Sequence, residues 1–209
     1  IESLFGLDYA NTKIEMLYGL LNEVQVGFSR ESFKKTYNIH VKYAIKKQTS
    51  TFPVSIVGYN SINLDTSLDE NIYPNLNFNE RYVYISQLLI SRRFSDNFSL
   101  QLSPSVVKHN FLTTQSETDY NYILNTGSRL KISKRSSFNI DYSHHLNRLS
   151  SSTEKNVLSL GVDMETGGHV FQLLFSNTQA SDEAGVLTMA EGDWLKGDVF
   201  FGFNILRVF

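Results

Sequence analysis

The sequence predicts an all-β fold, a transmembrane antiparallel up-and-down β-barrel formed by residues 1–209 as a single domain. Three observations predict it. Apolar and polar residues alternate with a period of two in one segment after another, which is the pattern of half-buried strands. Many of these segments run for about ten residues, the length of a tilted membrane-crossing strand. The connections between them alternate between short turns and long polar loops, as in outer-membrane barrels.

The composition narrows the class of protein. The 209 residues include no cysteine, so disulfides, thiolate metal sites and thiol nucleophiles are excluded. The net charge is -2 and the basic residues are spread along the chain, which argues against a nucleic-acid partner. No window approaches the roughly 20 consecutive apolar residues of a membrane-spanning helix. The start lacks the pattern of a signal peptide, so for a barrel we expect an export signal that has already been removed.

The first strands are the most regular. Two strands beginning near Lys13 and Val24 are joined by a tight turn at residues 20–23. A third begins near Lys35, and Pro53 opens a fourth, because proline at a strand start removes no essential ladder bond. In the third strand, one apolar set alternates with one more polar set: Tyr37, Ile39, Val41, Tyr43 and Ile45 against Asn38, His40, Lys42, Ala44 and Lys46.

The remaining strands follow a long polar loop at residues 65–79. Gly167 and Gly168 form a hairpin turn between two of them. The longest loop, residues 178–196, is acidic and holds the only tryptophan, Trp194. No segment has the pattern of a long helix. We expect eleven strands, beginning near Lys13, Val24, Lys35, Pro53, Arg81, Phe98, Tyr120, Ser137, Asn156, His169 and Asp198.

The last strand ends the sequence on a hydrophobic face made of Phe201, Phe203, Ile205 and Phe209. Chain termini usually fray into water, whereas the closing strand of an outer-membrane barrel ends in an aromatic girdle. We interpret it as the C-terminal barrel-assembly strand. The alternation of turns and loops then places Phe209 on the periplasmic side and the segment before Lys13 outside.

That topology predicts one strand more than the eleven. Single-chain bacterial barrels have even strand numbers, so we expect about twelve, with the first strand missing near the N-terminus. The alternative is that Ile1 to Asp8 is itself that strand, with a sequence pattern that is poorly recognisable.

The charged residues of most strands lie on the face opposite the apolar one. A charge at the bilayer midplane on the lipid side costs a few kcal/mol, so we expect this polar face to line a lumen. One interpretation is that these side chains pair and fill a narrow interior; the other is a small pore or solute site. The residues expected to face the lumen are Lys42, Lys46, Gln101, Arg129, Lys131, Asp141, Asp163 and Asn204.

No arrangement of residues predicts catalysis, a cofactor or a metal. His144 and His145 are adjacent on a strand and point to opposite faces, and the other histidines lie in separate strands with a structural or lumen role expected. The acidic loops contain Asp65, Asp69 and Glu70, and Asp182, Glu183, Glu191 and Asp193. Their oxygens suit a divalent cation, but the spacing matches no defined calcium loop. We therefore expect a solvated surface.

Several runs of sequence resemble a known family. They are VKYA (41–44), QLLISRRF (87–94), LSLGV (158–162), HVFQL (169–173) and GDVFFGFN (197–204). They are similar to a Bacteroidota outer-membrane β-barrel family of unknown function, and the likeness covers nearly the whole chain. In that family a further strand precedes the part that resembles Ile1 to Asn11. The family has no established catalytic residues, so the resemblance implies a fold and a location but no activity.

Three classes of function remain, in this order of preference. The first is a non-enzymatic barrel that serves as a structural or accessory subunit of a larger outer-membrane complex. The second is a small passive channel with a polar lumen, and the third is a soluble ligand-binding barrel. For the first two we expect the outer membrane of a Gram-negative bacterium as location. The expected partners are its lipids and lipopolysaccharide, the barrel-assembly machinery and other outer-membrane proteins.

Overall fold

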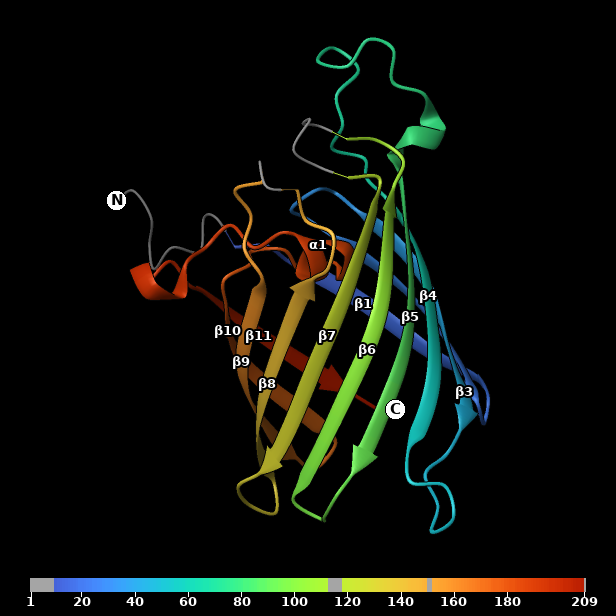
Figure 1. Ribbon diagram of the computed structural model, residues 1–209, viewed down its shortest axis with the longest axis vertical. Coiled ribbons are helices and arrows are strands. Elements are labelled where there is room, and N and C mark those ends of the chain that lie inside the picture. The colour runs from blue at the N-terminus through green and yellow to red at the C-terminus, as the bar shows by residue number, and fades with distance from the viewer. Residues whose placement is uncertain (1–9, 113–117, 150–151, 209) are drawn as a thin grey trace.

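Among the residues that the structure describes, eleven antiparallel strands follow one another in chain order within a single sheet (Figure 1). The computed structural model describes residues 10–112, 118–149 and 152–208. The all-β, up-and-down architecture is confirmed, and each strand begins within about two residues of the expected position. The strands are β1 (Lys13–Leu21), β2 (Val24–Glu31), β3 (Tyr37–Lys46), β4 (Ser55–Leu64), β5 (Tyr82–Arg93), β6 (Phe98–His109), β7 (Tyr120–Lys131), β8 (Ser136–His145), β9 (Val157–Thr166), β10 (His169–Ser176) and β11 (Phe200–Arg207).

The sheet curves so that its two faces have different surroundings. Side chains on one face pack around a short helix, α1 (Glu183–Thr188), and we call this the inner face. The outer face is apolar and largely exposed, with Ile39, Ile62 and Phe203 among its residues. A strand that is buried on one side only needs period-two alternation, which explains why the sequence pattern predicted the strands so well.

The connections gather at two ends of the barrel (Figure 1). The short turns, such as Gly167–Gly168 between β9 and β10, lie at what we call the turn end. The longer connections lie at the loop end. One holds a 3-10 helix, η2 (Phe78–Arg81), and another, between β10 and β11, holds α1 and a second 3-10 helix, η3 (Trp194–Lys196). No helix among the described residues is long and apolar enough to span a membrane.

Strands β1 and β11 form the two edges of the sheet as far as the structure describes it, since β1 bonds to β2 and β11 bonds to β10. An unpaired edge is costly in a membrane, where backbone groups have no water to bond. The expected twelfth strand, whether missing or formed by Ile1 to Asp8, lies outside the described residues. It stays a prediction.

Candidate functional site

The interior of the barrel near the loop end is occupied by part of the β10–β11 connection. We call residues 179–190, which include α1, the plug. Figure 1 shows α1 within the curve of the strands, in contact with β5, β7 and β9. Asp182 caps the helix, since its Oδ2 accepts a hydrogen bond from the backbone N–H of Gly185 at 3.1 Å. This acidic connection was expected to be a solvated surface, and for the plug that expectation is wrong, because Asp182 is only 5% exposed.

The plug is held partly by apolar contact. Ala184 and Leu187 lie one turn apart on the same face of α1, and both are buried. Full burial of a leucine side chain contributes about 2 kcal/mol. This small apolar contact holds the helix against the inner face of the sheet. The two residues pack in one cluster with Tyr59, Ile85, Val107 and Ile123 of the inner face.

Hydrogen bonds fasten the plug to strands on several sides. The backbone N–H and the hydroxyl of Ser181 both donate to Glu31 Oε1, at 2.7 and 2.5 Å. On the other side, Nε2 of His145 lies 2.9 Å from the carbonyl oxygen of Leu187. A carbonyl can only accept, so Nε2 carries the proton. Beyond the helix, Lys155 N–H donates to the carbonyl of Ala190 at 3.0 Å.

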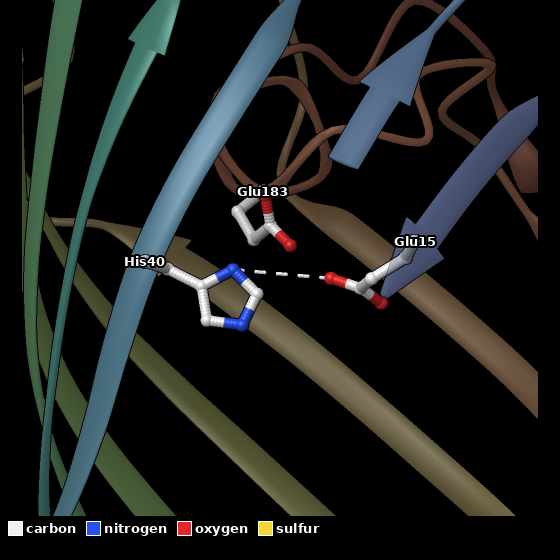
Figure 2. Close-up of side chains that lie close together, drawn as sticks. All are labelled: Glu15, His40 and Glu183. Carbon is white, nitrogen blue, oxygen red and sulfur yellow. Dashed lines mark ion pairs between the residues drawn. The ribbon is translucent and has the colours of Figure 1, made fainter. Parts of the chain in front are cut away.

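A charged cluster joins the plug to β1 and β3. Lys13 Nζ lies 2.8 Å from Glu183 Oε1 and 3.7 Å from Glu15 Oε1. Figure 2 shows Glu183 pointing from the plug toward His40 and Glu15, with the dashed line joining His40 Nδ1 and Glu15 Oε1 at 3.9 Å. The side chains of Lys13 and Glu183 are only 19% and 23% exposed. Their ion pair is therefore shielded from water far better than an exposed surface pair.

The position of His40 depends on its neighbours. Its Nδ1 lies 2.9 Å from Asn38 Oδ1, and Asn38 in turn donates from Nδ2 to Asn63 Oδ1 at 2.5 Å. The imidazole ring also packs on Tyr59, with centroids 5.3 Å apart. The ring lies over Gly27 of β2, where an added Cβ would stand 2.2 Å from His40 Cε1 and Nε2. The ring of His40 approaches the backbone of β2 so closely that only glycine, which has no Cβ, fits at position 27.

A histidine and two carboxylates are also a possible set of metal ligands. One ligand atom each from Glu15, His40 and Glu183 lie within 4.8 Å of one another. However, the ammonium group of Lys13 already lies beside both carboxylates and balances their charge. We therefore interpret this cluster as an ion-pair network that fastens the plug.

The residues predicted to face the lumen lie mostly in hydrogen-bonded groups. Arg129 bonds to Ser137 and Glu165, and its Nη2 lies 3.9 Å from Asp163 Oδ2. Asp163 accepts from Gln172, whose Oε1 accepts from Asn204. These contacts form a chain across β7, β9, β10 and β11.

The other predicted lumen residues lie on separate strands. Asp141 accepts from Asn125 at 2.7 Å, and Gln101 donates to Ser103. Lys131 pairs with Ser137 in register, and Lys42 pairs with Tyr59. A β-bulge after Ala44 pairs Lys46 with Ile56, so Lys46 leaves the alternation that places Lys42 on the inner face. That these eight side chains line a lumen stays a prediction.

The rest of the loop is fastened outside the plug. Trp194 Nε1 donates to the Leu158 carbonyl at 2.9 Å, and Lys155 forms an ion pair with Asp193. Hydrogen bonds from Lys155 and from the backbone N–H of Leu195 lower the pKa of Asp193. Between the plug and the loops lies a cavity of about 140 Å³, which Asp182 and Met189 help to line.

Sequence reasoning missed the plug. The only local signal is Asp182 followed by Ala184 and Leu187, an N-cap residue before two apolar positions one turn apart. A helix of six residues is too short to stand out from a polar loop by its pattern, because most of its stability comes from tertiary packing.

Comparisons with known proteins agree with this architecture. The family described as "Membrane bound beta barrel domain (DUF5777)" matches residues 1–209. A solved structure of the NanC porin superposes with a TM-score of 0.67 at 9% identity, over 95% of this chain and 93% of that chain. At this identity the likeness concerns the fold alone. No curated protein matches the sequence significantly.

Proposed function

This chain belongs to the family of membrane-bound β-barrel domains, and from that premise we propose that it is a closed, non-enzymatic outer-membrane barrel of a Gram-negative bacterium. Its role in this proposal is that of a structural or accessory subunit of a larger outer-membrane complex. The observation that carries it is the plug. Barrels of about eight strands are filled by side chains, and those of 16 or more enclose an aqueous channel. The sheet has eleven strands in the described part of the chain and so lies between these cases, and here the plug occupies the interior near the loop end.

Exposed apolar residues on the loops support the role as a subunit. Leu195 of η3 is 97% exposed, and Ile72 and Phe78 on the β4–β5 connection are also largely exposed. They lie on connections at the loop end and not on the strands. Contact with a partner protein would remove these side chains from water.

The same proposal includes partners that the strands would meet. The apolar outer face contacts outer-membrane lipids and lipopolysaccharide. The barrel-assembly machinery binds the C-terminal strand, where Phe201, Phe203 and Ile205 share the outer face. Phe209, the fourth residue of that prediction, lies outside the described residues.

Two measurements test the proposal. In planar bilayers at acidic pH the purified protein should show no steady conductance, and a constant open pore there would contradict a closed barrel. In native membranes, a lysine-reactive cross-linker should join Lys196, next to the exposed Leu195, to another protein. Lys47 at the turn end is the matched control, with a side chain that is 69% exposed. Cross-links from neither lysine, or from both equally, would contradict a partner at the loops.

A passive channel closed by the plug is the second candidate. The polar chain from Arg129 to Asn204 on the inner face favours it, because such groups suit a wet interior. Replacing residues 179–190 by a Gly-Ser linker of equal length should then produce conductance. If this variant shows no conductance although a heat-dependent gel shift verifies its folding, the result argues against the channel.

A further inference from the structure

Two buried carboxyl groups meet where the plug contacts the wall of the barrel. Glu31, the last residue of β2, is 1% exposed, and Asp182 of the plug is 5% exposed. One oxygen of each is engaged, Glu31 Oε1 by Ser181 and Asp182 Oδ2 by Gly185. The other oxygens, Glu31 Oε2 and Asp182 Oδ1, are buried without a donor. Ser181, which donates to Glu31, is the chain neighbour of Asp182, so the two buried carboxyls lie at the same contact between the plug and the wall.

Such a pair cannot hold two negative charges without a counter-ion. Two carboxylates in one buried site repel each other, and one of them retains its proton. Among the described residues, no Lys, Arg or His lies within 4.0 Å of either carboxyl. A single proton shared by the two carboxyls would supply a donor to this site and remove one charge.

We propose that the Glu31–Asp182 pair is a proton-dependent latch, which holds the plug in the lumen while the two carboxyls share a proton and releases it when that proton is lost to water. The proton enters and leaves through the cavity at the loop end, which Asp182 lines. The latch requires the plugged barrel but not the role as an accessory subunit, so the two proposals can fail separately.

The direction of the pH effect follows from the docked state. Burial, and then the charge of Glu31, raise the pKa of Asp182 to about 7. In the released plug this carboxyl returns to the ordinary value of about 3.9. At a pH between these two values, the plug therefore takes up a proton when it docks. Docking is tightest below about pH 4, weakens by up to about tenfold per pH unit as the pH rises, and levels off above about pH 7.

Other titratable and charged groups surround the latch. His145 donates to the Leu187 carbonyl from Nε2, and it does so whether or not its other nitrogen is protonated. Removing the charge of either latch carboxyl separates their effect from that of these neighbours. The groups near the plug are Lys13 and Glu15 on β1, Lys34 after β2, His40 on β3, Tyr59 on β4, His145 on β8, Arg148 after β8, and Glu183 within the plug. The cavity that Asp182 lines is also lined by Asp65, Glu80, Arg81, His109 and Glu154.

A spin label on the plug measures its docking directly. The sequence has no cysteine, so Met189→Cys provides a unique site facing the cavity. The labelled protein in detergent micelles with EDTA is followed by electron paramagnetic resonance between about pH 4.5 and pH 9. We expect the ratio of mobile to immobile label to rise by up to about tenfold per pH unit and to level off above about pH 7.

Variants decide whether the carboxyl pair causes the change. Asp182→Asn keeps an oxygen for the helix cap, and Glu31→Gln keeps the acceptor for Ser181, so either should leave the plug docked at every pH. Glu191→Gln, which changes an exposed acid of the same loop, should behave like the parent protein. The latch would be overturned if the mobility of the label in the parent protein did not change with pH. It would also be overturned if both latch variants showed the same dependence of label mobility on pH as the parent. Conductance of the Asp182→Asn variant in planar bilayers, where the plug should stay docked at every pH, tests the closed barrel separately from the latch.

Discussion

Substitution of Gly27 by alanine should destabilise the barrel, chiefly by displacing the ring of His40. The new Cβ would stand 2.2 Å from Cε1 and Nε2 of His40 and 2.8 Å from Cδ2 of Leu17. These separations are far below van der Waals contact, so the imidazole has to move. Displacement breaks its hydrogen bond with Asn38, worth about 1 kcal/mol, and overpacking adds about 1–3 kcal/mol. The expected loss in the free energy of unfolding is about 2–4 kcal/mol.

Urea unfolding of the refolded protein in detergent micelles measures this loss. With a slope of about 2 kcal/mol per molar urea, the midpoint should fall by about 1–2 M. Gly19→Ala is the matched control, because an added Cβ there meets no atom within 4 Å, and it should change the free energy of unfolding by less than about 0.5 kcal/mol.

A double-mutant cycle identifies the clash as the cause. In a His40→Ala background the ring is absent, so Gly27→Ala should cost about 1–3 kcal/mol less than it does in the parent protein. The reasoning is wrong if Gly27→Ala unfolds at the parent's urea concentration. It is also wrong if the cost stays the same without the ring of His40.

Three other perturbations test the attachment of the plug and its loop. Lys13→Met removes the shielded ion pair to the plug and should lower the free energy of unfolding in urea by about 1–3 kcal/mol. Lys47→Met, which removes an exposed ion pair, should lower it by less than about 0.5 kcal/mol. Equal losses from the two variants would contradict the shielding. Leu187→Ala should weaken docking by about 2–4 kcal/mol and speed hydrogen exchange of the plug amides by about 30-fold or more, and unchanged exchange would show that the plug is held without it. Because the pKa of Asp193 is lowered, its contribution holds above about pH 4 and is lost as the pH falls further. The emission of Trp194 should therefore shift to the red in acid, and a shift at alkaline pH instead would refute that sign.

The strands and their order followed from the sequence because their signal is local. A strand buried on one side repeats every two residues, and each turn or loop interrupts that repeat. The alternation from Tyr37 to Lys46 predicted a strand, and β3 pairs with β4 without interruption from Tyr37 to Ala44. The bulge that follows was missed, because one extra residue in a strand changes the pairing without changing the composition.

The position of the plug could not be derived in the same way. Lys13 and Glu183 are 170 residues apart, and Glu31 and Ser181 are 150 apart. No local pattern relates residues at such distances, and the acidic composition of residues 178–196 is equally typical of a solvated loop. The loop folds inward because Ala184 and Leu187 find an apolar cluster on the inner face, which exists only once the sheet has curved.

The sequence by itself determined the class of fold, the alternation of turns and loops, and the division of each strand into an apolar and a polar face. These depend on neighbours along the chain and on the surroundings of each strand. Only the tertiary structure decided that the interior is occupied, and that the buried carboxyls of Glu31 and Asp182 meet there. The physical reason is that burial and charge pairing are properties of the curved sheet, which brings β1 and β2 next to the connection between β10 and β11.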